Sequence, residues 1–180
     1  LEITSIAGDV VAGLIDLDKV SGLARIGSVS RIESSRPLTK ELDASLPEIR
    51  ADLVHTGPPG HRGAGVIVGI IDSGIDWQHQ SFRRQDGTSR ILRIWDQGLN
   101  PQGTEHRPPG FTYGVEYTNT DIDTALGSPN PAQVVRHIDR APDSGHGTHV
   151  TGIAAGDGSV AGNGQPAFTF VGVAPEADII

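Results

Sequence analysis

Two histidines in a segment of small side chains are the first residues that could carry out chemistry. His146 and His149 stand three positions apart within residues 144–156, where Gly, Ala and Thr dominate. Small residues permit close backbone approach, and the pattern places His146 at the entrance of a helix. The segment alone leaves three interpretations open, because an imidazole there could be a base, a metal ligand or a buried group satisfied by hydrogen bonding.

An aspartate in a strand-like segment is the second candidate. Asp72 ends the apolar run of residues 65–72, whose continuity is typical of a parallel strand that is covered on both faces. Ser73 and Gly74 then turn the chain at the carboxyl end of the strand, which is where open α/β sheets place functional groups. The carboxylate could cap this turn or take part in catalysis.

Asp72 and His146 together have the residue types that nucleophilic acyl transfer requires. The imidazole takes a proton from a weak nucleophile, and a carboxylate fixes the ring tautomer and stabilises the imidazolium. The N-terminus of a helix disfavours a resting positive charge on His146, which keeps the ring available as a base. The two residues are far apart in sequence, so the fold must bring them together.

The first 40 residues predict a small separate unit. Residues 3–15 favour a strand or a hairpin with its turn near Gly8, residues 16–27 a short helix, and residues 29–35 another strand. A β-α-β unit of this size is too small for a core of its own, so we expect it to dock on something larger.

Further elements follow in the remaining chain. Residues 46–54 predict a helix beginning near Pro47, and residues 90–96 predict a strand. Residues 98–142, rich in Pro, Gly, Asn and Asp, predict a surface insertion that contains one helix, capped by Thr118 and ended by Gly127.

The composition excludes several classes of function. With 14 basic and 22 acidic residues the net charge is −8, without long blocks of like charge, so a nucleic-acid or anionic-membrane surface is not expected. No apolar stretch is long enough to span a bilayer. Cysteine is absent, which rules out disulfides and thiolate metal sites. Methionine is absent too, so we expect a piece of a longer protein whose targeting signal lies upstream and whose last strand, near Ile180, is cut short.

Two stretches resemble the signatures around the catalytic Asp and His of the subtilisin-like serine peptidases. They are Val68-Gly69-Ile70-Ile71-Asp72-Ser73-Gly74-Ile75-Asp76 and Gly145-His146-Gly147-Thr148-His149-Val150-Thr151-Gly152, and Gly172-Val173-Ala174-Pro175-Glu176-Ala177 resembles the turn before the next core strand of that family. The resemblance extends over residues 46–180. It implies an α/β, subtilisin-like three-layer fold with a mostly parallel sheet, truncated here. It also implies that Asp72 orients the imidazole, His146 is general base and then acid, His149 is a structural helix residue and Asp76 a turn residue.

The same resemblance implies a domain organisation and a function. Residues 1–40 would be the C-terminal portion of a prosegment, and residues 41–180 the N-terminal half of the catalytic domain, with the insertion at about 98–142. The full-length protein would then be a serine endopeptidase, secreted or in the cell envelope, that acts on peptide or protein substrates. This piece lacks the nucleophilic serine, since neither Ser73 nor Ser144 matches its context, so we expect it to be inactive without the missing C-terminal half of the domain.

No cofactor is implied for the chemistry, and a structural calcium ion is possible in the full-length protein. Where the family commonly has an Asp in its calcium site, this chain has Ser81. Asp157 and Asn163 could hold a cation or form a solvated turn.

Two other functions remain as alternatives. The full-length protein could be a pseudo-peptidase, a regulatory module that binds peptides and lacks a nucleophile. It could also be a metal hydrolase that uses His146 and His149, although their spacing is poor for a helical ligand pair. We also expect the isolated piece to behave poorly in solution or to associate, because a half-domain exposes sheet edges.

Overall fold

The computed structural model describes residues 2–33, 42–139, 145–162 and 164–180. The chain forms two compact units, Leu1–Lys40 and Glu41–Ile180, and each is described by itself. Two of the residues singled out in the sequence, Ser144 and Asn163, lie outside the described residues.

The first unit is a hairpin followed by a short helix. Strands β1 (Glu2–Ala7) and β2 (Val10–Leu14) pair antiparallel, as expected, and are followed by the 3-10 helix η1 (Leu17–Lys19) and helix α1 (Val20–Leu23). The strand expected over residues 29–35 is wrong for residues 29–33, which have no regular structure, and residues 34 and 35 lie outside the described part. In the described chain β1 and β2 pair only with each other, so the hairpin gains no third strand. The unit is therefore not the expected β-α-β unit, and none of its residues whose burial is described is buried.

Two short helices open the second unit, where one was expected. Helix α2 (Leu42–Glu48) contains Pro47, and helix α3 (Ala51–Thr56) begins after Arg50, whose φ of 59° is left-handed. The single helix over residues 46–54, with Pro47 at its start, is therefore wrong. Because proline interrupts the helical hydrogen bonds around it, α2 ends one residue beyond Pro47.

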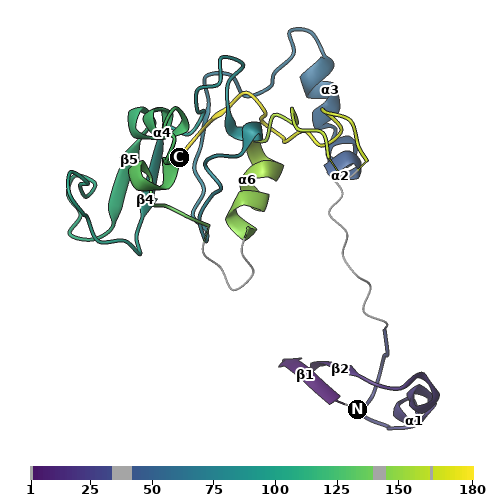
Figure 1. The fold of residues 1–180 in the computed structure, drawn as a ribbon. Coiled ribbons are helices and arrows are strands. Elements are labelled where there is room, and N and C mark those ends of the chain that lie inside the picture. The colour runs from purple at the N-terminus through teal and green to yellow at the C-terminus, as the bar shows by residue number, and fades with distance from the viewer. Residues whose placement is uncertain (1, 34–41, 140–144, 163) are drawn as a thin grey trace. The chain divides into compact units, whose positions relative to one another are not determined.

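The second unit contains two short two-stranded sheets in its described residues, one parallel and one antiparallel (Figure 1). Strand β3 (Ile67–Val68) pairs parallel with β6 (Asp178–Ile179), and Ile91 forms a parallel bridge to Ile179 on the other side of β6. Strand β4 (Arg93–Asp96) continues from that bridge and pairs antiparallel with β5 (Val115–Thr118).

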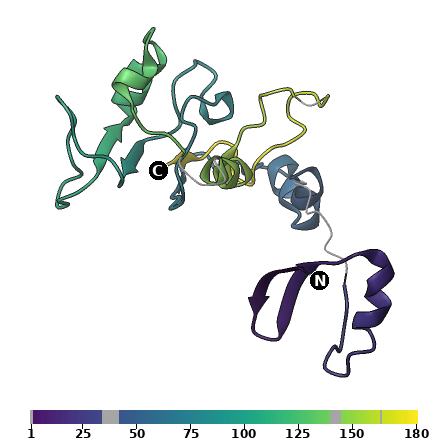
Figure 2. The ribbon, with the colours of Figure 1, turned by 60° about the horizontal axis from the view of Figure 1, so that its bottom comes forward.

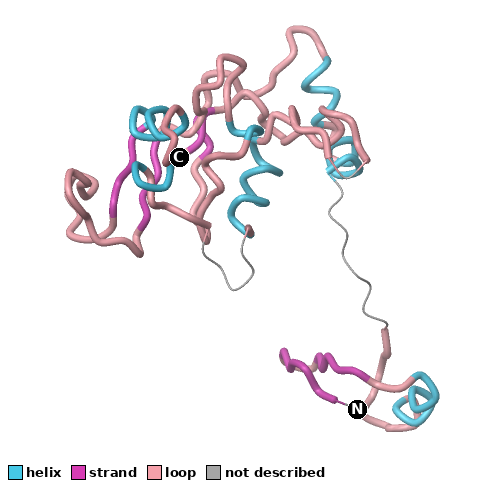
Figure 3. The backbone as a smooth tube through the Cα atoms, viewed as in Figure 1, coloured by secondary structure: helices cyan, strands magenta, loops and turns pink. Residues whose placement is uncertain are grey.

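The apolar run ending at Asp72 forms a shorter strand than predicted, and that strand is not covered on both faces. Only Ile67 and Val68 are in the strand, Ile67 is 57% exposed, and Ile71 is 97% exposed. In the described chain β3 has one neighbouring strand, β6, so the other edge is unpaired. Figure 3 shows how much of the unit is loop around these short strands.

Residues 98–142 contribute to the core, whereas a surface insertion was expected. Besides β5, this segment contains α4 (Asn119–Leu126) and α5 (Pro131–Val134). Helix α4 is the predicted one: Thr118 and Asp121 form a capping box, and Gly127 is the C-cap. Several side chains of the segment are buried in the main hydrophobic cluster with Trp77, Phe82 and Ile91: Val115, Tyr117, Ile122, Ala125 and Val135. Helix α4 and strand β5 are therefore part of the hydrophobic core.

Helix α6 (His146–Ala155) lies between the β4–β5–α4 region and the α2–α3 pair, as Figures 1 and 2 show. Its small residues Gly147, Thr151 and Ala155 are buried. The end of α6 lies beside the 3-10 helix η2 (Gln80–Phe82), since the amide of Asp157 donates to the carbonyl of Ser81. No helix in the described part of the chain is long and apolar enough to cross a membrane.

Candidate active site

His146 and Asp72 meet at the start of α6. The Nδ1 atom of His146 lies 2.7 Å from Oδ1 of Asp72. His146 is the first residue of α6, and Asp72 stands in the turn after β3, so two distant segments supply the pair. The imidazole is 62% exposed and the carboxylate of Asp72 is 19% exposed, so the ring is open to an approaching group while the carboxylate is mostly covered.

Hydrogen bonds keep Asp72 ionised. The hydrogen bond from His146, followed by the backbone N–H of Ser73 at 2.7 Å, lowers the pKa of Asp72 below its ordinary 3.8. An ionised carboxylate can only accept, so the proton between the two side chains sits on Nδ1 of His146. The ring is thereby held in the tautomer whose Nε2 atom can accept a proton.

Two glycines let the two segments meet. A Cβ atom on Gly147 would stand 2.1 Å from the carbonyl oxygen of Gly74, and a Cβ on Gly74 would stand 2.8 Å from Cα of Asp139. Gly74 also has a φ of 140°, which favours glycine. The small residues of the histidine segment therefore serve a direct backbone contact between the start of α6 and the turn after Asp72.

Sequence reasoning missed a set of polar residues around the pair. Ser73 Oγ donates to Asp139 Oδ1 at 2.6 Å, and the amide of Gly147 donates to Ser73 Oγ at 3.0 Å. Thr148 donates to Asp139 Oδ2 through its amide at 2.9 Å and its hydroxyl at 2.7 Å. Ser73 and Thr148 adjoin the candidate residues in sequence, which is a signal that could have found them, whereas nothing in the sequence singles out Asp139.

A second Asp–His pair lies buried behind the same turn. His137 Nδ1 is 2.8 Å from Asp96 Oδ2, and both side chains are almost fully covered. The Nε2 atom of His137 accepts a hydrogen bond from the amide of Ile75 at 3.1 Å. The backbone carbonyl of His137 accepts the indole N–H of Trp77. Both ring nitrogens are engaged, so this histidine supports the turn and cannot serve as a base. The pair also borders a cavity of about 790 Å3 that Asp72 lines and His146 does not.

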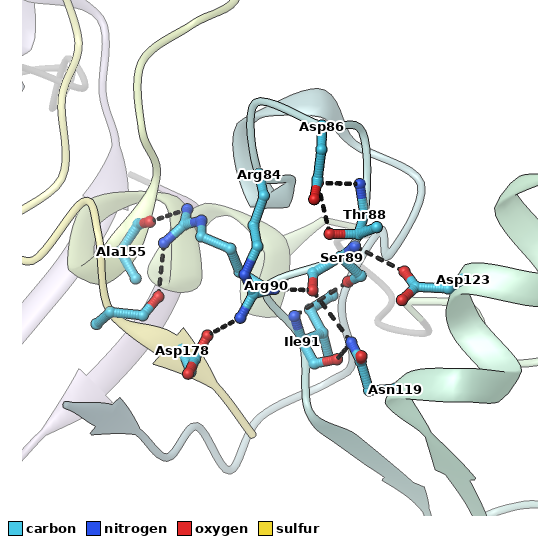
Figure 4. Close-up of polar contacts among 11 residues, drawn as sticks. Arg84, Asp86, Thr88, Ser89, Arg90, Ile91, Asn119, Asp123, Ala155 and Asp178 are labelled. Atoms are coloured by element: carbon cyan, nitrogen blue, oxygen red, sulfur yellow. Dashed lines mark hydrogen bonds and ion pairs between the residues drawn. The ribbon is translucent and has the colours of Figure 1, made fainter. Parts of the chain in front are cut away.

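Ser81 stands where the family commonly has an Asp of its calcium site, and a guanidinium group lies beside it. Ser81 is buried, and its carbonyl accepts the amide of Asp157 at 3.1 Å and the guanidinium of Arg90 at 2.6 Å. Arg90 also donates to the carbonyl of Ala177 and to that of Ala155, and Figure 4 shows the contact with Ala155. A fixed positive charge thus already engages three carbonyl oxygens at this place. Asp157 forms a turn by accepting from the amide of Ser159.

The metal-hydrolase interpretation has no support in the geometry. His146 directs Nδ1 at Asp72, and the described residues contain no group of three or more His, Cys, Asp or Glu side chains that could hold a metal ion. Asp76, expected to be a turn residue, accepts from the amide of Gln78 and thus closes a local turn.

The hydrogen bond between His146 and Asp72, which follows the parallel strand β3, makes Nε2 the ring atom that can exchange a proton with an approaching group. The model of the Subtilase family matches residues 63–180, so the chain belongs to the subtilase family and has its α/β, subtilisin-like fold.

Individual relatives agree with this assignment. The chain is 33% identical over 120 residues to the subtilisin-like protease PopC of Myxococcus xanthus (67% of this chain, 16% of that protein). It is 30% identical over 126 residues to the PII-type proteinase of Lactococcus lactis subsp. cremoris (67% of this chain, 6% of that protein). The solved CspB protease of Clostridium perfringens matches with a TM-score of 0.53 and 33% identity, covering 72% of this chain and 24% of that one. The chain thus spans only a small part of the length of these relatives.

Proposed function

We propose that the full-length protein is a subtilisin-like serine endopeptidase, in which Asp72 and His146 are two of the three catalytic residues. The observation that carries the proposal is the 2.7 Å hydrogen bond between Nδ1 of His146 and Asp72, in a chain of the subtilase family. Family membership alone does not say whether the side chains of Asp72 and His146 meet in this chain. Their hydrogen bond therefore supports the proposal that they act together.

The two residues would divide the proton transfer between them. His146 would take the proton of a serine hydroxyl through Nε2 as that oxygen attacks the substrate carbonyl, and would then give it to the leaving amine. Asp72, ionised at neutral pH because its pKa is lowered, would hold the ring in place and stabilise the imidazolium. The serine would come from outside residues 1–180, so this chain alone would be inactive.

The partners and location follow from the same proposal. The substrates would be peptides or proteins, and the rest of the catalytic domain would cover the unpaired edge of β3, near the exposed Ile67 and Ile71. The first unit, residues 1–40, would be the end of a prosegment. By family analogy, the protein would be secreted or held in the cell envelope. No cofactor would be required for the chemistry.

Labelling by a serine-directed phosphonate tests the proposal. The full-length protein should be labelled, and Asp72→Asn and His146→Ala should each slow labelling by at least about a thousandfold, as loss of a triad member does. His106→Gln is the matched control, because His106 is an exposed histidine that pairs with Glu116. Labelling of the 180-residue chain itself would contradict the absence of a nucleophile. A full-length protein that binds peptides but takes no label would be the pseudo-peptidase.

A further inference from the structure

Helix α6 begins without a cap of its own. Its N-cap residue, Gly145, has no side chain to accept the first amides of the helix. Ser73 Oγ accepts the amide of Gly147, and Asp139 accepts the amides of Gly145 and Thr148. The groups that cap the N-terminus of α6 therefore come from two other segments of the chain.

These two segments are the ones that hold the other half of the candidate site. Ser73 follows Asp72 directly and donates its hydroxyl to Asp139 at 2.6 Å. A single chain of hydrogen bonds thus runs from the neighbour of Asp72, through the Asp139 carboxylate, to the first turn of the helix that begins with His146. A local cap would stabilise α6 without fixing it to Asp72, whereas this arrangement does both.

The backbone contacts in this region are close on both sides of the turn. Gly74 touches both Gly147 and the 138–139 backbone so closely that a Cβ on either glycine would clash. The amide of Asp76 donates to Thr148 Oγ1 at 2.7 Å, which ties the far side of the turn to the same helix. A shift of α6 relative to Asp72 must therefore break the hydrogen bonds that join Gly147 to Ser73, Thr148 to Asp139, or Thr148 to the amide of Asp76.

We propose that Asp139 is a positioning residue for the catalytic pair, acting through Ser73 and Thr148 to fix the separation of Asp72 and His146. This inference rests on the proposed peptidase function. Asp139 touches neither reacting atom, so its effect is on geometry and on the local field. The roles proposed for Asp72 and His146 in proton transfer remain as described above.

The charge of Asp139 has a consequence for His146. Partial burial opposes ionisation of Asp139, but hydrogen bonds from Ser73 and Thr148 together bring its pKa below the ordinary 3.8. The carboxylate is thus ionised beside the positive end of α6, where it offsets the helix dipole that disfavours a charged His146. The ionisable side chains on the described segments that meet here are Asp72, Asp76, His137, Asp139, His146 and His149.

The test compares Asp139→Asn with Asp121→Asn in the full-length protein. Asp121 is a close match, because it also accepts from the amide and the hydroxyl of one threonine, Thr118, at the start of α4. It is part of the α4 capping box, outside the candidate site. Loss of stability from a missing helix cap is thereby common to both variants.

Three measurements separate positioning from capping. Asp139→Asn should lower kcat on a peptide substrate about tenfold or more, since small displacements of catalytic groups are costly, and leave KM nearly unchanged. The acid limb of the pH profile should move about half a pH unit lower, because a negative charge near His146 is lost. Titration of His146 by NMR should show the same shift. Asp121→Asn should change none of these.

A second pair of variants keeps the test decisive if Asp139→Asn does not fold. Ser73→Ala should reproduce the loss of kcat, and Ser73→Thr, which keeps the hydroxyl, should restore it in part. Equal values for Asp139→Asn and Asp121→Asn, or an unchanged Ser73→Ala enzyme, would overturn the proposal. If the parent protein cleaves nothing and takes no phosphonate label, the peptidase proposal has failed, and the NMR titration still decides whether Asp139 acts on His146.

Discussion

Replacing Arg90 with methionine should strongly destabilise the chain, because it removes a buried charge that binds three carbonyl groups. Arg90 is 4% exposed and donates to the carbonyls of Ser81 at 2.6 Å and Ala177 at 2.7 Å, and also to that of Ala155. Methionine has a similar length and is apolar, so it fills the space without offering a donor. The variant therefore isolates the loss of the guanidinium (Figure 4).

The expected magnitude follows from the carbonyls that are left behind. Ser81 keeps the amide of Asp157 as a donor, whereas the carbonyls of Ala155 and Ala177 each lose a charge-assisted bond. A buried acceptor left unsatisfied costs about 1–3 kcal/mol. Because burying the charge also costs free energy, which the variant recovers, we expect a net loss of about 3 kcal/mol in the free energy of unfolding. For a chain of this size that lowers Tm by roughly 10 °C.

The role of the charge can be tested together with calcium. If Arg90 supplies the cation at Ser81, millimolar calcium and a chelator should leave the Tm of the 180-residue chain equal. Arg90→Lys keeps a positive charge but has no planar fork to span three carbonyls, so its Tm should fall between those of the parent and Arg90→Met. Thermal unfolding followed by circular dichroism measures all three.

Arg93→Met is the control, since Arg93 is half-exposed and its nearest carboxylate, Glu116, is 3.7 Å away. An exposed pair of this kind contributes at most about 1 kcal/mol. The reasoning is refuted if Arg90→Met loses no more stability than Arg93→Met. A drop in the parent's Tm on chelation would separately refute the claim that Arg90 takes the place of a cation at Ser81.

Three further changes have definite expected outcomes. Gly147→Ala should lower the free energy of unfolding by about 3 kcal/mol, because the new Cβ would meet the carbonyl of Gly74. Gly152→Ala is the control, since the space around Gly152 is open and the change should be neutral or stabilising. Chemical denaturation compares the two variants. The hydrogen bond from Arg136 lowers the pKa of Glu105 to about 2 from 4.5, so the chain should lose stability as pH falls from about 4.5 toward 2. Glu105→Gln should flatten that part of the stability–pH curve, and an unchanged curve would assign the acid loss elsewhere. Thr118→Ala should cost about 1 kcal/mol by removing the cap of α4, which amide hydrogen exchange in α4 would detect.

Local signals predict the elements that local interactions decide. Helix α4 is predictable because Thr118 and Asp121 cap it within three residues, and the first hairpin because Gly8 permits its turn. Asp72 and His146 are predictable as candidates because each stands in a long motif that its own chemistry explains. Their 2.7 Å contact cannot be read from the sequence, because the two segments are far apart along the chain and only the fold brings them together.

Tertiary interactions explain the elements that were wrong. The pattern ending at Asp72 predicts a fully covered strand, but the strand spans only Ile67 and Val68 and has one neighbour in the described chain, and Ile71, beyond its end, is exposed. The frequent Pro and Gly of residues 98–142 predict a surface insertion, yet Tyr117 and Ile122 are core residues. Composition reports how a segment turns, and only packing decides which of its apolar residues are buried.

Helix α6 shows why the positioning residues could not be predicted with the catalytic pair. Glycines at positions 147 and 152 give the helix a low intrinsic propensity, and Gly145 provides no cap. Other segments stabilise both ends instead: the Asp139 carboxylate lies at the N-terminal amides, and the Arg90 guanidinium binds the Ala155 carbonyl in the last turn. Each charge has the sign that complements the helix dipole. The histidine segment is therefore held in place by charges from elsewhere in the chain, and its small residues serve contact with the Asp72 turn at the cost of independent helix stability.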